Sequence, residues 1–225
     1  MPLPPAADGR QLRHQRLFDL QIYARGNGEW EVDAWLRDTK TRDVPLGDGV
    51  RKAGTPIHEM LLRLVIDQRF QILQAGSETR WMPYEGLCGE HGDAYAQLVG
   101  LNLMRNFRAD VRERLSGIKG CTHITELAQV LPTAVVQAFA GDVIDPRGSA
   151  DSAHPPPQLD RCHALRHDGE AVRMHYPRWY RAAEPDGAGE PGRVASARAT
   201  ASDWHPNLAA ASGSPKNPTD PKDNP

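Results

Sequence analysis

The chain has 225 residues, and its 27 Lys and Arg residues nearly balance its 29 Asp and Glu residues, giving a net charge of −2. Stable binding to nucleic acid or to an anionic membrane requires a clear excess of basic residues, so this balance argues against both as obligatory partners. Hydrophobic residues without Gly make up 39% of the sequence, somewhat below the roughly 45 to 50% of a compact domain, a figure that also counts Gly. The composition therefore predicts segments that lie outside the packed core.

Proline marks where these segments are. Fourteen of the 19 prolines fall in three stretches, namely 1–10, 143–157 and 183–225. The apolar residues of the last stretch are mostly alanines, which bury too little surface to offset the entropy of ordering a chain. We therefore expect disordered tails at 1–10 and 183–225, and a single domain over 11–182 that contains 143–157 as a linker.

The sequence predicts a soluble cytoplasmic protein. No apolar run approaches the ~20 residues of a membrane span, and the first ten residues, MPLPPAADGR, lack the layout of a signal peptide. In that compartment the three cysteines are expected to be thiols or metal thiolates, not disulfides.

Residues 16–37 predict a β-hairpin. Apolar side chains occupy alternate positions before and after a Gly-Asn-Gly turn: Phe18, Leu20, Ile22, then Trp30, Val32, Ala34 and Leu36. This alternation is typical of strands with one buried face. After a polar loop at 39–56, alternate residues from His58 to Ile66 predict a second antiparallel pair that returns through 70–75.

The later part of the chain has helical periodicity. Asp93, Asn106 and Thr122 can each cap a helix. The residues 164–166 and 171–174 flank Asp168-Gly169, a favoured turn, and so predict a small C-terminal hairpin. The expected class is therefore α+β, in which an antiparallel sheet from the N-terminal hairpins carries helices on one face.

Cysteine and histidine recur as close neighbours in this sequence. Each cysteine has a histidine within three residues, and His58 lies on the inward face of its predicted strand. Thiolate and imidazole are preferred ligands of zinc and iron. The candidate metal ligands are therefore His58, Cys88, Cys121, His123, Cys162 and His163. Burial of the same residues as ordinary packing groups is the alternative interpretation.

Cys121 also fits a catalytic role. It directly precedes a predicted helix, where backbone N–H groups favour an anionic thiolate. With His123 as a base, Cys121 would be a nucleophile or a sulfur acceptor. Glu126 is either a second base or a charge that stabilises the helix start. No phosphate-binding Gly-rich loop, GxSxG or HExxH motif is present, so nucleotide chemistry, serine hydrolysis and zincin proteolysis lack support.

Aspartates recur at five-residue intervals across the first hairpin and the loop after it. Asp33 is expected to face out of its strand, and Asp38, Asp43 and Asp48 are assigned to the loop. Solvated positions explain these four residues better than a carboxylate pair for acid–base chemistry.

Several segments resemble a bacterial family, common in proteobacteria, that is catalogued as a domain of unknown function. The segments are GEWEVDAWLRDTK, AGTPIHEMLLRLVID, LVGLNL, GCTHITEL and DRCHAL, and the resemblance covers about 16–179. It implies that His58, Cys121, His123, Cys162 and His163 fall in the family's signature segments. The family brings no established activity.

The layout from His58 onward also resembles that of the U-type iron–sulfur scaffold proteins. The shared features are an M-x-L-x-I strand, a Gly-Cys loop before a helix, and a last cysteine that opens a helix. This resemblance implies His58, Cys88 and Cys121 as metal ligands. His58 stands where that family has an acidic residue, and no histidine directly precedes Cys121.

Three functions are consistent with these observations. The first is a metal-binding or sulfur-handling accessory protein that holds zinc or iron. The second is a small lyase or hydrolase acting on an organic acid or aromatic compound, with Cys121 and His123 as nucleophile and base and an arginine such as Arg63 binding a carboxylate. The third is a non-catalytic binding module. The expected partner is a small molecule or another protein.

Overall fold

The structure, a computed structural model, describes residues 2–47, 49–91, 93–147, 154–156 and 158–182. Contacts divide these residues into two compact units, 2–139 and 140–182, which we describe separately. The predicted tail at 183–225 and part of the predicted linker lie outside the described residues. The single domain expected over 11–182 stays a prediction.

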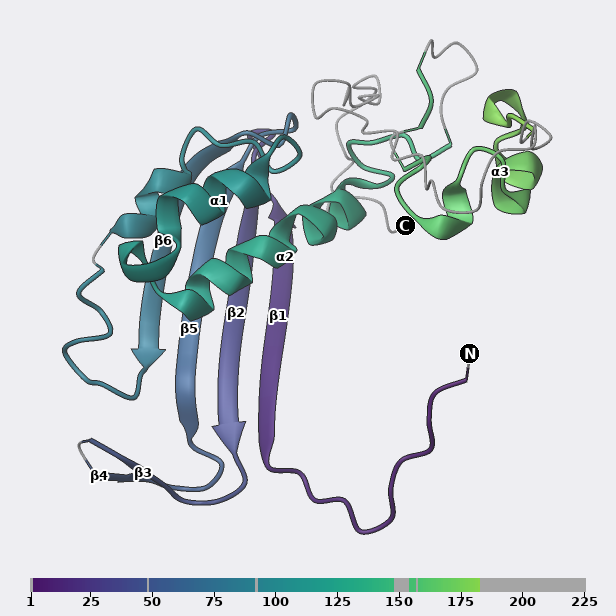
Figure 1. The fold of residues 1–225 in the computed structure, drawn as a ribbon. Coiled ribbons are helices and arrows are strands. Elements are labelled where there is room, and N and C mark those ends of the chain that lie inside the picture. Colours follow the sequence, from purple (N-terminus) through teal and green to yellow (C-terminus); the bar gives the residue numbers. More distant parts are fainter. Residues whose placement is uncertain (1, 48, 92, 148–153, 157, 183–225) are drawn as a thin grey trace, which may run out of the picture. The chain divides into compact units, whose positions relative to one another are not determined.

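A four-stranded antiparallel sheet in the order β1-β2-β5-β6 forms the base of the first unit (Figure 1). Its strands are β1 (His14–Ala24), β2 (Trp30–Lys40), β5 (Pro56–Ile66) and β6 (Ile72–Trp81). The first two strands pair in one continuous register, which confirms the predicted hairpin. The predicted polar loop contains a second, two-stranded hairpin, made of β3 (Val44–Leu46) and β4 (Gly49–Arg51).

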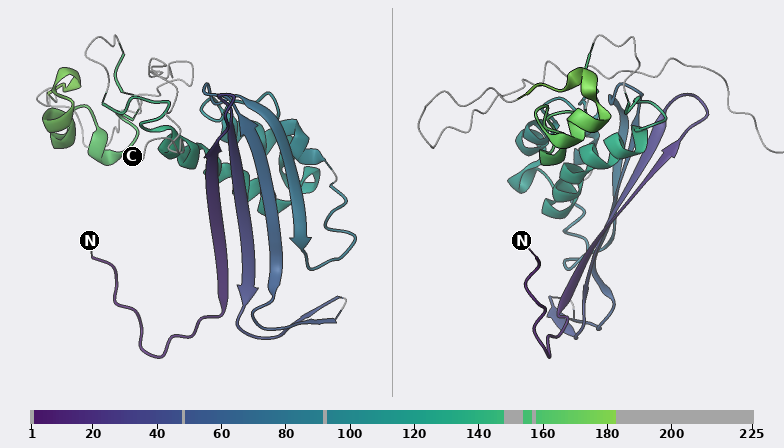
Figure 2. Two further views of the ribbon diagram at one scale, coloured as in Figure 1. Left: turned by 180° about the vertical axis from the view of Figure 1, so that it is seen from behind. Right: turned by 90° about the vertical axis from the view of Figure 1, so that its right-hand side faces the viewer.

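One face of the sheet carries the helices of this unit. The right-hand view of Figure 2 shows the sheet nearly edge-on, with these helices on one side. They are η1 (Ala94–Leu98), α1 (Phe107–Leu115), η2 (Gly117–Lys119) and α2 (Thr122–Phe139). α2 lies against β1, β2 and β5, because its apolar residues recur at helical spacing and are fully buried: Ile124, Leu127, Leu131 and Val135. This arrangement confirms the α+β class with helices on one face of an antiparallel sheet.

An aromatic cluster fixes the C-terminal end of α2. The Phe139 ring lies 4.8 Å from the Trp30 ring and 4.6 Å from the Phe70 ring, measured between centroids. Phe139 and Phe70 are fully buried. The helix is therefore held against the sheet at the end far from residue 122.

The second unit contains three short helices: η3 (His163–Leu165), α3 (Glu170–His175) and η4 (Pro177–Trp179). The predicted C-terminal hairpin is wrong, because both of its expected strands lie in or beside these helices. Asp168-Gly169 leads into a helix instead of a turn between strands. Glu170, Ala171, Arg173 and Met174 are good helix formers, and Val172 is the single β-branched residue of that segment. No helix in the described part of the chain has both the length and the apolar content needed to cross a bilayer.

Candidate metal centre

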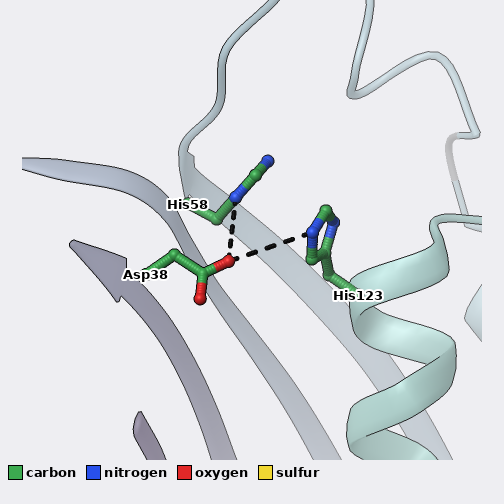
Figure 3. A group of neighbouring side chains, drawn as sticks. All are labelled: Asp38, His58 and His123. Carbon is green, nitrogen blue, oxygen red and sulfur yellow. Dashed lines mark hydrogen bonds and ion pairs between the residues drawn. The ribbon is translucent and has the colours of Figure 1, made fainter. Parts of the chain in front are cut away.

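Three side chains from three separate elements meet between the sheet and the start of α2 (Figure 3). They are Asp38 of β2, His58 of β5 and His123 in the first turn of α2. One ligand atom of each lies within 4.8 Å of the ligand atoms of the other two. Asp38 and His58 are direct partners in the β2–β5 register, and α2 brings His123 over them.

Asp38 lies in a strand, which corrects the assignment of this residue to a solvated loop. β2 continues to Lys40, so Asp38 follows Val32, Ala34 and Leu36 on the face that the helices cover. Its side chain is 3% exposed. The inward residues of this strand alternate, so the second residue after Leu36 is also expected on the inward face. Extending the alternation by two residues beyond Leu36 would have identified Asp38.

The Asp38 carboxylate accepts hydrogen bonds from both neighbouring strands. The Arg16 guanidinium donates through Nε to Oδ1 and through Nη2 to Oδ2, each at 2.8 Å. His58 Nδ1 lies 3.0 Å from Oδ2, and His14 Nε2 lies 3.3 Å from Oδ1. Burial opposes ionisation of this carboxyl, but the hydrogen bonds and charge of Arg16 and the His58 bond outweigh it, so the pKa of Asp38 is lowered. Asp38 is therefore a carboxylate at neutral pH.

The two histidines form a stacked, neutral pair. The ring centroids of His58 and His123 are 3.9 Å apart, with planes inclined by 33°. Burial lowers the pKa of His58, and the nearby His123 lowers it further. Burial and the charge of Arg16 likewise lower the pKa of His123. Because a carboxylate only accepts hydrogen bonds, the His58–Asp38 contact places a proton on His58 Nδ1.

The ionised groups around the pair carry both signs. Arg16 Nη1 donates to Glu126 Oε2 at 2.6 Å, so a single guanidinium lies between the carboxylates of Asp38 and Glu126. His14, whose Nε2 lies 3.3 Å from Asp38 Oδ1, adds a second positive charge when it is protonated. With His14 neutral, the two carboxylates outnumber the single guanidinium, and the site then favours a cation over an anion. Glu126, predicted as a second base or as a charge that stabilises the helix start, is paired with Arg16 and is 47% exposed.

Cys121 lies beside the three-residue group, against the other end of the His123 ring. Its Sγ is 3.9 Å from His123 Nδ1 and 3.8 Å from Met60 Sδ. The Cys121 carbonyl accepts the first hydrogen bond of α2, from Thr125 N at 2.9 Å. Cys121 therefore occupies the cap position of the helix, one residue before the predicted cap Thr122.

The structure brings together two of the six predicted metal ligands, His58 and His123, and places Cys121 next to them. Cys88 is half-buried in the segment between β6 and η1. Cys162 is exposed and lies with His163 in the second unit. Within the described residues, Cys88, Cys162 and His163 belong to no group of three or more possible ligands. Asp38 is the member of this group that the sequence did not identify.

A comparison with known protein families identifies the family of this chain. The family model described as "Protein of unknown function (DUF2889)" matches residues 14–137. The chain belongs to this family. The match covers more than half of the sequence and includes Asp38, His58 and His123, whereas the DRCHAL segment lies beyond it. No curated protein and no solved structure matched the chain.

Proposed function

We propose that this member of the DUF2889 family binds one divalent transition-metal ion, zinc or iron(II), through Asp38, His58 and His123. The observation that supports this function is the convergence of one carboxylate and two imidazoles, from β2, β5 and α2, within 4.8 Å. Two histidines and one carboxylate are a ligand set that proteins use for zinc and for non-haem iron. Three protein ligands leave positions for water or a small molecule.

The protonation states of the group suit a metal ion. A metal requires deprotonated ligands, and burial keeps His58 and His123 in the neutral form while Asp38 is ionised. An ion held by Asp38 Oδ2 and His58 Nδ1 would replace the proton that these two atoms now share. While His14 is neutral, the two carboxylates around Arg16 add to the attraction.

Arg16 is compatible with this role because it binds Asp38 along one side. A carboxylate offers about four acceptor positions. Arg16 uses one on each oxygen, and an ion would take the position on Oδ2 that His58 uses now. Arg16 would then orient the carboxylate from outside the coordination shell, as partners of metal-bound carboxylates commonly do.

Metal titration of the full-length protein tests this function. Protein stripped with a chelator is titrated calorimetrically with Zn²⁺ and, without oxygen, with Fe²⁺. We expect one ion per chain. His58→Ala and His123→Ala should each lower the affinity by more than the 10- to 100-fold that is typical of changes outside the coordination shell.

His167→Ala is the matched control. His167 Nδ1 also lies 3.1 Å from a carboxylate, that of Asp160, but this pair is exposed and belongs to no group of three among the described residues. Its replacement should leave the affinity unchanged. The proposal would be overturned if the wild-type protein bound no metal, or if His58→Ala and His123→Ala bound it with the wild-type affinity.

A second candidate function uses the Cys121–His123 pair in catalysis. The 3.9 Å between Sγ and Nδ1, with Asp38 Oδ2 3.9 Å from Nε2 of the same ring, places the three groups in the order of a thiol, a base and an orienting carboxylate. Such an enzyme would carry out the lyase or hydrolase chemistry considered above. Its test is the rate at which iodoacetamide alkylates Cys121 below pH 7, compared with exposed Cys162; equal rates would exclude an activated nucleophile.

A further inference from the structure

We propose that Cys121 is a positioning residue for the metal site. Its sulfur contacts His123 Nδ1 from outside the coordination shell and leaves Nε2 of the same ring free for the ion. This inference rests on the proposed function. It differs from the expectation that Cys121 is itself a ligand.

The two nitrogen atoms of His123 face different partners. Nδ1 lies 3.9 Å from Cys121 Sγ, whereas Nε2 lies 3.9 Å from Asp38 Oδ2. An ion bound to Nε2 would lie about 2.0 to 2.1 Å beyond that atom, on the Asp38 side of the ring. The sulfur is at the opposite end, so one ion cannot use His123 Nε2 and Cys121 Sγ together in this geometry.

The contacts of Cys121 suit the tautomer of His123 that an ion on Nε2 requires. With the ion on Nε2, the ring proton lies on Nδ1 and can be donated to the lone pairs of Cys121 Sγ at 3.9 Å. The single thiol proton can then be donated to Met60 Sδ at 3.8 Å, and Met60 is 1% exposed. Asp38 Oδ2 and the Nε2 lone pair, 3.9 Å apart, then face each other as two acceptors with the cation between them.

The backbone holds Cys121 in place for this contact. Its carbonyl accepts a hydrogen bond from the Tyr95 hydroxyl at 2.7 Å, and that hydroxyl also lies 2.9 Å from Thr125 Oγ1. Before it, Gly120 passes so close to its neighbours that a Cβ there would lie 3.0 Å from the Leu115 carbonyl oxygen and 3.1 Å from the Tyr95 hydroxyl. The sulfur is therefore placed by packed groups, as a partner that orients a ligand must be.

The first test reads the tautomer in the metal-bound protein. In full-length protein labelled with ¹⁵N at histidine and loaded with Zn²⁺, long-range ¹H–¹⁵N spectra at neutral pH report which ring nitrogen carries the proton and which binds zinc. We expect the proton of His123 on Nδ1 and the zinc on Nε2. Zinc on Nδ1, with the proton on Nε2, would overturn the positioning role of Cys121 and leave the proposed function standing.

The second test is metal affinity with a spectroscopic readout. Co²⁺ bound to the wild-type protein should give no sulfur-to-cobalt charge-transfer band. Cys121→Ala should weaken Co²⁺ and Zn²⁺ binding about 10- to 100-fold. Cys121→Ser should retain more affinity than Cys121→Ala, because a hydroxyl can also accept from Nδ1. Cys88→Ser and Cys162→Ser are the matched controls and should bind like the wild-type protein.

The outcomes separate this inference from the proposed function. A charge-transfer band that Cys121→Ser abolishes would show that sulfur is a ligand and would overturn the positioning role. Wild-type affinity in Cys121→Ala, together with lost affinity in His58→Ala, would overturn it and leave the proposed function standing. Absence of metal binding by the wild-type protein would overturn both.

Discussion

Arg16 and Asp38 lie directly opposite each other in the β1–β2 register and are joined by two hydrogen bonds of 2.8 Å. The pair stands on the face of the sheet that α2 covers. Arg16 extends beyond Asp38 to Glu126 on that helix. A single arginine thus links the edge strand, its neighbour and the helix, and it defines one side of the candidate metal centre.

Removing the carboxylate of this pair should destabilise the fold even without metal. We expect Asp38→Ala to lower the free energy of unfolding by about 3 kcal/mol, which is the lower end for one partner of a buried ion pair. The lower end applies because Arg16 keeps Glu126 and its side chain is 30% exposed. Urea unfolding in the presence of a chelator measures the change.

The Asp33–Arg63 pair provides the control on the opposite face of the sheet. These residues are also direct partners in a strand register and also share two hydrogen bonds, each of 2.6 Å. The Asp33 side chain is 11% exposed, but Arg63 is 51% exposed and also lies 3.7 Å from Glu31. Because Arg63 keeps solvent and a second carboxylate, Asp33→Ala should cost about 1 kcal/mol, less than Asp38→Ala. If Asp38→Ala and Asp33→Ala lowered the free energy of unfolding equally, burial under α2 would not be what makes the Arg16–Asp38 pair important.

Tyr95 should give the protein a measurable alkaline transition. Burial raises the pKa of Tyr95 to about 12, from 10.0. Because the folded state holds this proton more tightly than the unfolded state, its contribution is complete below pH 10 and is lost as the pH rises toward 12. Unfolding free energies measured between pH 9 and 12 should fall more steeply in the wild-type protein than in Tyr95→Phe.

Tyr95→Phe should also be less stable at neutral pH, by about 1 kcal/mol, since it removes one of the two hydrogen bonds that the half-buried Cys121 carbonyl accepts. A variant as stable as the wild-type protein, with the same alkaline profile, would show that this hydroxyl does not hold the start of α2.

Docking of α2 on the sheet should depend on Phe139. Its ring fills the space between Trp30 and Phe70, so Phe139→Ala should lower the free energy of unfolding by about 3 to 5 kcal/mol. Denaturant unfolding followed by tryptophan fluorescence measures this change. Exposed Ile118 is the control: Ile118→Ala should leave stability within about 0.5 kcal/mol. A loss below about 1 kcal/mol for Phe139→Ala would mean that this end of α2 is not packed as described.

Metal should stabilise the folded chain. An ion that binds the native state alone adds about 2.7 kcal/mol when its free concentration is 100 times the dissociation constant. Zn²⁺ should therefore raise the melting temperature of the stripped protein by several degrees, and EDTA should reverse the shift. The shift should vanish in His58→Ala and persist in His167→Ala. A shift of equal size in both variants would indicate binding elsewhere on the chain.

Much of the sheet could be predicted from the sequence because one of its faces is buried. The alternation from Phe18 to Leu36 follows directly from that burial. The helix after Thr122 was predictable for the same reason, since its apolar residues repeat at helical spacing and contact the sheet. The C-terminal hairpin was predicted wrongly because Asp168-Gly169 suits either a turn or the residues before a helix, and local sequence does not decide between them.

The candidate site was only partly predictable, for a different reason. His58 and His123 were recognised by their residue type and position, but Asp38 was set aside because an aspartate near a polar loop looks solvated. Asp38 is surrounded by side chains of β1, β5 and α2, and the last of these lies far along the chain. Cys88 and Cys162 carried the same sequence signal as Cys121, a histidine within three residues, yet only Cys121 lies beside the group that the fold assembles. Sequence spacing alone could not separate them.

The order of the elements along the chain sets when an ion could first be held. The strands that carry Asp38 and His58 are complete at residue 66, whereas the third candidate ligand lies at residue 123, in the helix that lies over them. A nascent chain leaving the ribosome would therefore expose a two-ligand sheet until α2 emerges. An ion could bind all three residues only after the helix is synthesised. Because it would contact both the strands and the helix, it would then stabilise the docked helix against the sheet.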